Sequence, residues 1–197
     1  MIITVASFKG GVGKTTTAVH LAAYLQGKAP TLLVDGDANR SASAWAQRGE
    51  FPFKVVDERQ GVRYAKDFDH VVIDTEARPD QDDLKALAGG CDLLVLPTTP
   101  DALALDALML TLGALKQLGA EQYKVLLTII PPRPSHDGDE AREMLRTNKI
   151  PTFKTGVRRY VAFQKAALAG VPVYAVNDPR SQQAWQDYMA VGKEIAR

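Results

Sequence analysis

Three glycines and two lysines stand together near the amino terminus of the chain, in the stretch from Lys9 to Thr16. Glycines let a loop turn so tightly that successive backbone N–H groups point at one anion, and a following helix adds the positive end of its dipole. The stretch therefore predicts a phosphate-binding loop (P-loop), in which Lys14 reaches the β- and γ-phosphates and Thr15 binds Mg²⁺. The predicted nucleotide-binding residues are Lys9, Gly10, Gly11, Val12, Gly13, Lys14, Thr15 and Thr16. The general P-loop pattern has a glycine where this chain has Phe8, and Lys9 is an additional lysine inside the loop.

Carboxylates follow two further apolar runs. Asp35 and Asp37 come after the run Leu32–Val34, and Asp74 comes after Val71–Ile73. Because the carboxyl ends of parallel strands meet at one edge of a sheet, these side chains are expected to lie beside the P-loop. One lysine-rich loop and three carboxylates in one crevice are what a Mg²⁺-nucleotide site requires.

Apolar β-branched runs alternate with helical patterns along the chain, which predicts an α/β fold: a mainly parallel twisted sheet with helices on both faces. The predicted strands are Ile2–Ser7, Thr31–Asp35, Phe53–Asp57, His70–Asp74, Asp92–Pro97 and Lys124–Ile130. The predicted helices are Lys14–Gln26, Arg40–Gln47, Asp80–Ala88, Asp101–Leu118, Asp137–Thr147, Arg159–Ala169 and Ser181–Ala196.

Length and composition favour one cytoplasmic domain over residues 1–197. A chain of 197 residues is long enough to bury a sizeable core. The single cysteine, Cys91, allows no intramolecular disulfide and suits a reducing compartment. No apolar run approaches the roughly 20 residues that span a bilayer, and the first residues lack the pattern of a secretory signal.

The last third of the chain is basic. Residues 142–197 carry 10 Lys and Arg against 4 Asp and Glu, whereas residues 1–141 carry 14 against 19. Such a segment could be a phosphate-binding surface or only a set of solvated helix faces. The candidate DNA-binding residues are Arg142, Arg146, Lys149, Lys154, Arg158, Arg159 and Lys165. No base-reading motif accompanies them, so any DNA binding is expected to be non-specific.

The loop and the two aspartate motifs resemble the ParA/MinD family of deviant Walker A ATPases, whose loop reads Lys-Gly-Gly-x-Gly-Lys-Thr/Ser-Thr. The resemblance implies a P-loop ATPase that uses ATP and Mg²⁺. It assigns catalytic roles to Lys9, Lys14 and Asp37: Lys9 crosses to the nucleotide of a second subunit, and Asp37 orients the attacking water. Asp35 would support the water shell of the metal, and Asp74 would hold Mg²⁺ directly or through water.

The resemblance also implies a biological role. The expected protein forms an ATP-sandwich homodimer, binds DNA non-specifically, and is cytoplasmic and nucleoid-associated when ATP is bound. A ParB-like or other cargo adaptor would stimulate ATP hydrolysis, and the cargo would be a plasmid, a chromosome region or a protein assembly. In the family a turn of the type Gly170–Val173 lies near the adenine. Glu76 and Arg78 are candidates for the switch region or dimer interface, or for an exposed ion pair.

A MinD-like protein is the alternative to this role. A MinD-like membrane-cycling ATPase would bind lipid through a C-terminal amphipathic helix, whereas Ser181–Arg197, with few late cations, favours a helix docked on the protein.

The segment Asp101–Leu118 has more leucines than one helical stripe needs. The surplus could meet a second subunit or be covered by the chain's own C-terminal helices.

Overall fold

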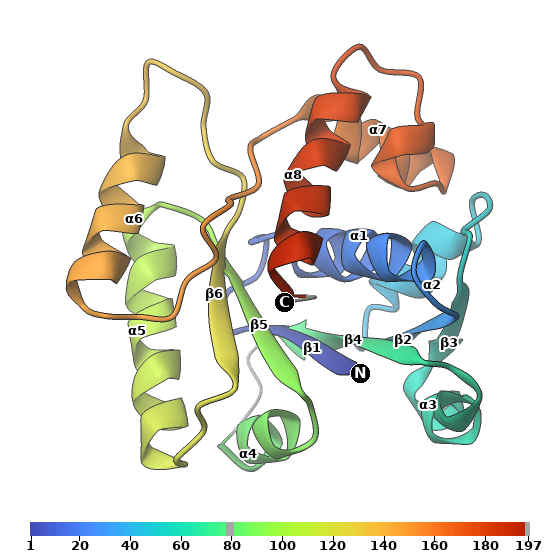
Figure 1. Ribbon diagram of the computed structural model, residues 1–197, viewed down its shortest axis with the longest axis horizontal. Coiled ribbons are helices and arrows are strands. Elements are labelled where there is room, and N and C mark those ends of the chain that lie inside the picture. The colour runs from blue at the N-terminus through green and yellow to red at the C-terminus, as the bar shows by residue number, and fades with distance from the viewer. Residues whose placement is uncertain (78–80, 196–197) are drawn as a thin grey trace.

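The computed structural model describes residues 1–77 and 81–195, and within them a parallel β-sheet lies between layers of helices (Figure 1). In these residues the sheet has six strands in the order β3-β2-β4-β1-β5-β6, and all paired neighbours are parallel. The strands are β1 (Ile2–Ser7), β2 (Thr31–Gly36), β3 (Lys54–Asp57), β4 (His70–Ala77), β5 (Leu93–Thr98) and β6 (Tyr123–Leu127). The predicted α/β fold is thus confirmed.

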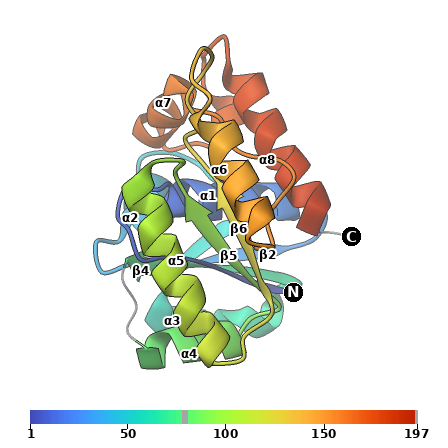
Figure 2. The same ribbon diagram turned by 90° about the vertical axis from the view of Figure 1, so that its left-hand side faces the viewer.

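Helices follow most of the strands. The α-helices are α1 (Lys14–Gln26), α2 (Ser41–Ala46), α3 (Glu58–Tyr64), α4 (Gln81–Gly89), α5 (Ala102–Gln117), α6 (Asp137–Thr147), α7 (Val161–Ala169) and α8 (Ser181–Ile195). Two short 3-10 segments are η1 (Ala65–Asp67) and η2 (Val173–Ala175). In Figure 2, α5 and α6 lie in front, beside the β6 edge of the sheet.

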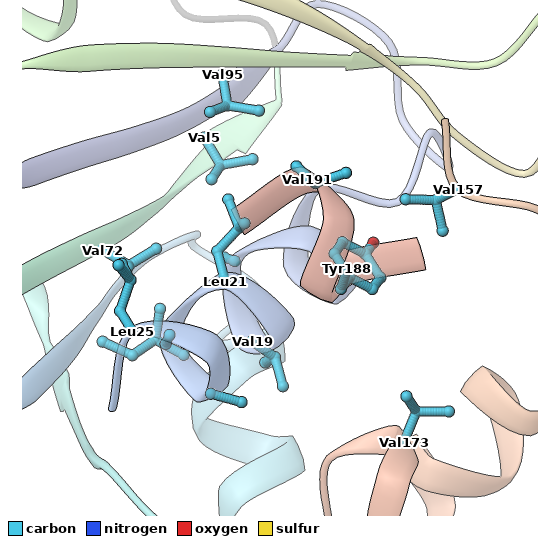
Figure 3. Close-up of a cluster of buried hydrophobic side chains, with 14 of the residues drawn as sticks. Val5, Val19, Leu21, Leu25, Val72, Val95, Val157, Val173, Tyr188 and Val191 are labelled. Atoms are coloured by element: carbon cyan, nitrogen blue, oxygen red, sulfur yellow. The ribbon is translucent and has the colours of Figure 1, made fainter. Parts of the chain in front are cut away.

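Alternate strand residues pack on opposite faces of the sheet, because successive side chains of a strand point in opposite directions. Ile3 and Val5 of β1 belong to a core shared with α1, α2, α7 and α8. Leu94 and Leu96 of β5 belong to a second core shared with α4, α5 and α6. Figure 3 shows Leu21 of α1 in the first core, between the sheet valines and α8. The strands therefore carry nearly continuous apolar runs, as both faces are covered.

Strand β1 occupies the centre of the sheet, between β4 and β5. The chain leaves it toward β2 on one side and later reaches β5 on the other side, so the strand order reverses at β1. Ligands of such sheets bind beyond the carboxyl ends of the strands at this reversal. The loop after β1 is the predicted P-loop.

Two sequence-based predictions of elements were wrong. The last strand ends at Leu127 and not at Ile130, because Ile129 has a φ of +51° that is incompatible with a strand. Helix α3 was not predicted. Its first turn is capped by the Asp57 carboxylate, which accepts a hydrogen bond from the Gln60 backbone at 2.9 Å. The first residue of the predicted helix Asp80–Ala88 lies outside the described residues, and α4 begins at Gln81.

Candidate nucleotide-binding site

The loop Phe8–Gly13 joins the end of β1 to the start of α1. Gly11 and Gly13 have φ values of +81° and +84°, in the left-handed region that side chains disfavour. A Cβ at Gly10 or Gly11 would meet nothing within 4 Å, so the loop backbone borders open space. The loop is therefore shaped as a cradle with its backbone accessible, at the N-terminus of a 13-residue helix. This is the geometry that an anion site requires.

Lys14 and Thr15 open helix α1 directly behind the cradle. The Lys14 side chain is buried, although an ammonium group is rarely buried without a partner. Both residues lie near Asp74, since the Thr15 hydroxyl and the Lys14 charge lower the pKa of that carboxyl. The first turn of α1 and the inner part of β4 thus face one another across the site.

Asp74 is the most unusual charged group of the site. Its side chain is fully buried, and neither carboxylate oxygen has a hydrogen-bond partner of ordinary geometry among the described residues. Burial raises the pKa of Asp74 to about 7, and the nearby Thr15 and Lys14 offset this effect only in part. Buried polar atoms in proteins are nearly always paired, so an orphaned carboxylate indicates a missing ligand. A divalent cation at this position would supply it.

Asp35 and Asp37 lie next to Asp74 but already have partners. Asp35 is in register with Asp74 on the neighbouring strand, and its two oxygens accept backbone hydrogen bonds from Asp37 at 3.2 Å and from Ser43 at 2.7 Å. One oxygen of Asp37 accepts from the backbone and side chain of Asn39, at 2.8 and 3.0 Å. Both aspartates therefore shape the turn before α2, and their metal and catalytic roles stay predictions.

The residues present fit Mg²⁺ bound together with phosphates. Within residues 1–77 and 81–195, no group of three or more His, Cys, Asp or Glu side chains could hold a metal ion by itself. Mg²⁺ usually binds one or two carboxylates and completes its shell with water and substrate phosphates. Asp74 and Thr15 beside the cradle match that mode. The Mg²⁺ would supply positive charge to the phosphates.

A cavity of about 400 Å³ lies beside the cradle, within the range typical of small-molecule sites. Gly13 and Thr16 form its P-loop side, and Tyr160 and Phe163 contribute aromatic rings. Its other lining residues are Thr128, Ile129, Val157, Arg158, Arg159, Gln164, Ala167 and Tyr188. The cavity could hold a base and sugar whose phosphates lie in the cradle.

The sequence did not reveal this cavity. Residues 128–129 follow β6, and residues 157–167 reach the same place through the segment that runs along β6. The Thr128 hydroxyl donates to the Val12 carbonyl at 2.7 Å and so ties the cavity wall to the P-loop. The turn Gly170–Val173 lies against Trp45 and His20, whose side chains contact Val171 and Val173, and its place near an adenine stays a prediction.

Lys9 lies at the rim of the loop and is held differently from Lys14. Its ammonium group donates to the Asp101 carboxylate at 2.8 Å, and both side chains are partly exposed. Asp101 also caps α5 by accepting from the Ala104 backbone, and it accepts from the Thr99 hydroxyl. Its pKa is lowered to about 2, mainly by Lys9 and then by Thr99. Lys9 is thus directed toward α5, at the surface.

Most of the predicted DNA-binding cations have partners within the chain. Arg142 donates to the Phe153 carbonyl, Arg146 pairs with Glu143, Arg158 with Asp187, and Lys165 with Asp178. Among the described residues, the side chains of Lys149, Lys154 and Arg159 have no such partner, and Arg159 lines the cavity. The seven residues are distributed over α6, the segment 148–159 and α7, and α6 and α7 lie apart in Figure 1.

Helix α5 has one buried and one exposed row of leucines. Leu108 and Leu115 of α5 are buried, whereas Leu103 and Leu110 are 73% and 77% exposed. Burial of the surplus leucines under the C-terminal helices is therefore wrong, because α7 and α8 cover the other face of the sheet.

Helix α8 packs its bulky side chains inward. Tyr188 is buried and Trp185 packs on Tyr174 and His20, which confirms the prediction of a docked helix. None of the described helices is long and apolar enough to cross a membrane.

Glu76, a candidate for the switch region or dimer interface, is exposed, and Arg78 lies outside the described residues.

Comparison with known proteins agrees with the site. The family description "CobQ/CobB/MinD/ParA nucleotide binding domain" matches residues 3–173. The chain is 37% identical to a maintenance of carboxysome distribution protein A from Gloeobacter kilaueensis, over 100% of this chain and 94% of that one. It is also 37% identical to a protein ParA from Rhizobium radiobacter, over 93% and 89%. A solved Cyanothece McdA–ATP complex has the same fold, with a TM-score of 0.79 at 16% identity, covering 99% and 96%.

Proposed function

The chain belongs to the CobQ/CobB/MinD/ParA nucleotide-binding domain family, and we propose that it is a ParA-type ATPase whose ATP-bound homodimer positions or segregates a cargo. Two ATP molecules are sandwiched between the subunits. Mg²⁺ accompanies each nucleotide, and a cargo adaptor stimulates hydrolysis. The relatives named for carboxysome distribution and for ParA support a positioning role, and they leave a protein assembly, a plasmid and a chromosome region as candidate cargoes.

The observation that carries the proposal is the contrast between the two lysines of one loop. Lys14 is buried behind the cradle, where it can neutralise phosphate charge in its own subunit. Lys9 is at the rim, and its partner Asp101 lies at the start of the helix with exposed leucines. A second subunit that meets this rim would receive Lys9 at its own nucleotide.

The chain's own residues divide the work of hydrolysis. The backbone of the cradle and Lys14 hold the phosphates, while Thr15 and Asp74 hold the metal's side of the site. Asp37 orients the attacking water and accepts its proton, and the Asn39 contacts keep its carboxylate in place. Closing of the dimer excludes bulk water and adds Lys9, so that hydrolysis waits for assembly.

The test compares Lys9→Gln with Lys14→Gln, a matched pair that removes one positive charge from each end of the loop. Lys14→Gln should lose ATP binding. Lys9→Gln should bind Mg-ATP as monomer but form no ATP-dependent dimer. Light scattering after size exclusion measures the dimer, and titration calorimetry measures binding. ATP-dependent dimers of Lys9→Gln would refute the sandwich.

Non-specific DNA binding by the closed dimer, and hence nucleoid association, is part of the proposal. Lys149 and Lys154 are the best residues to test it, because neither side chain forms an ion pair with the described residues. The double variant Lys149→Gln/Lys154→Gln should weaken binding to every sequence, and the slope of log K against log salt should fall by about 0.9 for each lost phosphate contact. Unchanged slopes in fluorescence anisotropy would place the DNA surface elsewhere.

The MinD-like alternative lacks a specific observation in its favour. Its amphipathic helix would need a free bulky face, but Tyr188 of α8 is buried and Trp185 is half-buried against His20 and Tyr174. Co-sedimentation with anionic liposomes in Mg-ATP provides the check. The adaptor and cargo can be identified by capture from a lysate on the ATP-bound Asp37→Ala protein.

A further inference from the structure

His20 is a buried histidine of α1 that the hydrolysis mechanism does not use. It is 0% exposed, and both ring nitrogens have backbone partners. Nε2 lies 3.0 Å from the Val173 backbone nitrogen, and Nδ1 lies 2.6 Å from the Thr16 carbonyl oxygen. The Val173 N–H can only donate, so Nε2 must accept, and Nδ1 carries the proton that is donated to Thr16. The two contacts define a single neutral tautomer.

Aromatic rings surround the imidazole on the sides that the hydrogen bonds leave free. Tyr188 stacks on it with centroids 4.8 Å apart and an interplanar angle of 15°, and Phe163 meets it edge-on at 5.2 Å. Trp45 and Trp185 lie at 5.8 and 6.4 Å. Burial lowers the pKa of His20 to about 4, so the ring stays neutral near pH 7.

Three neighbours of His20 line the cavity beside the cradle. Thr16 accepts its hydrogen bond, while Phe163 and Tyr188 rest against its ring. Thr16 belongs to α1, Phe163 to α7 and Tyr188 to α8. Tyr188 also meets the hydroxyl of Thr17 at 3.1 Å. His20 therefore lies behind the cavity wall, at the point where the P-loop helix joins the two C-terminal helices.

We propose that His20 is a positioning residue for the nucleoside half of the site: its two directional hydrogen bonds and its ring contacts hold Phe163 and Tyr188 at a set distance from the P-loop. This inference rests on the proposed nucleotide function. An apolar side chain of similar volume could fill the space, but it would leave the Val173 N–H and the Thr16 carbonyl without these partners. Phe163 and Tyr188 would then no longer be held at a fixed position relative to the P-loop, whereas the backbone of the P-loop would keep its own geometry.

The test separates the nucleoside from the phosphates by measuring binding of Mg-ATP and of inorganic tripolyphosphate with Mg²⁺. His20→Leu should weaken ATP binding about tenfold, a loss of about 1.4 kcal/mol, and change tripolyphosphate binding by less than about twofold. His20→Gln keeps one donor and one acceptor and should recover most of the ATP affinity. Leu115→Ala, in the core on the other face of the sheet, serves as a destabilised control and should change neither affinity.

The outcomes distinguish this inference from the function on which it rests. If the unaltered protein binds tripolyphosphate as tightly as ATP, the cavity is no nucleoside site and the proposed function loses its support there. If ATP is preferred and His20→Leu keeps that preference, or loses both ligands equally, the positioning role is overturned.

A measurement on the unaltered protein covers the case in which His20→Leu does not fold. Long-range ¹H–¹⁵N correlation spectra at pH 7 should show His20 protonated at Nδ1. Its resonances should move when ADP is added and stay in place with tripolyphosphate. A His20 signal that ignores ADP, or a ring protonated at Nε2, would overturn the inference.

Discussion

In β4, Asp74 buries two carboxylate oxygens that have no hydrogen-bond partner among the described residues, whereas in α8 both carboxylate oxygens of Asp187 accept hydrogen bonds from Arg158. The first group is costly to the folded chain unless a cation arrives, and the second is satisfied within the chain. The two groups are both buried carboxylates, and they differ in their partners. A charged group at a ligand site is therefore recognised by its missing partner more than by its residue type. The Asp74 carboxylate is thus available to a cation, whereas most of the candidate DNA-binding cations of the C-terminal third have partners within the chain.

Among the residues of the candidate nucleotide-binding site, replacement of Asp37 should have the largest effect on ATP turnover. Asp37→Ala removes the group proposed to orient and deprotonate the attacking water, and ATP turnover should fall by about 100-fold or more. ATP binding and dimerisation should persist, because within the described residues the Asp37 carboxylate forms hydrogen bonds only to Asn39 of the local turn. Phosphate release and calorimetry measure the two quantities. Loss of ATP binding would mean that Asp37 is a structural aspartate.

Asp74 gives a prediction on stability. Its folded-state pKa of about 7 exceeds the ordinary value of 3.8, so between these pH values the folded chain binds a proton that the unfolded chain has released. The free energy of unfolding of the ligand-free protein should therefore decrease as pH rises through this window, by up to about 1.4 kcal/mol per pH unit. Asp74→Asn cannot titrate and should lack this contribution.

Urea unfolding of both proteins at pH 5 and pH 8, without Mg²⁺ or nucleotide, isolates the contribution of Asp74. The variant should gain stability relative to the unaltered chain at pH 8, yet its Mg-ATP affinity should fall. Equal differences at the two pH values would show that Asp74 is charged and paired in solution, contrary to the comparison.

Arg158 tests the other side of the comparison. Arg158→Ala leaves the buried Asp187 without its guanidinium, and the free energy of unfolding should fall by about 1–2 kcal/mol, discounted because Arg158 is half exposed. Arg159, one residue away, has no ion pair in the described part of the chain, so Arg159→Ala is the matched control and should change stability by less than about 0.5 kcal/mol. Equal stability of the two variants would class Arg158 with the free cations.

Asp101 is the intermediate case, because it forms a partly exposed ion pair with Lys9 at the rim of the P-loop. Asp101→Asn keeps an N-cap for α5 but weakens the hold on Lys9, so ATP-dependent dimerisation should tighten by up to about fivefold, as expected of a surface ion pair. Sedimentation equilibrium in Mg-ATP measures the change. A weaker dimer would mean that the pair with Asp101 places Lys9 for its partner.

The P-loop prediction rested on residues close together in the sequence. Gly11 and Gly13 adopt the left-handed conformations that their lack of a side chain permits, and α1 begins at Lys14 as predicted. Helix α3 was missed although Asp57 and Glu58 are an ordinary start signal, because the apolar pattern after them is weak. The early end of β6 could not be foreseen, since a φ of +51° at Ile129 has no local signal in a β-branched residue.

The partners of the charged groups were beyond the reach of the sequence. Lys9 and Asp101 are 92 positions apart, and His20 and Val173 are 153 apart. The sequence by itself determined the phosphate cradle and the alternating elements, because backbone geometry and apolar periodicity are encoded within a few residues. The tertiary structure decided which carboxylate is left without a partner, which arginine is paired and which rings enclose His20, because burial and ion pairing depend on distant segments that meet only in the folded chain.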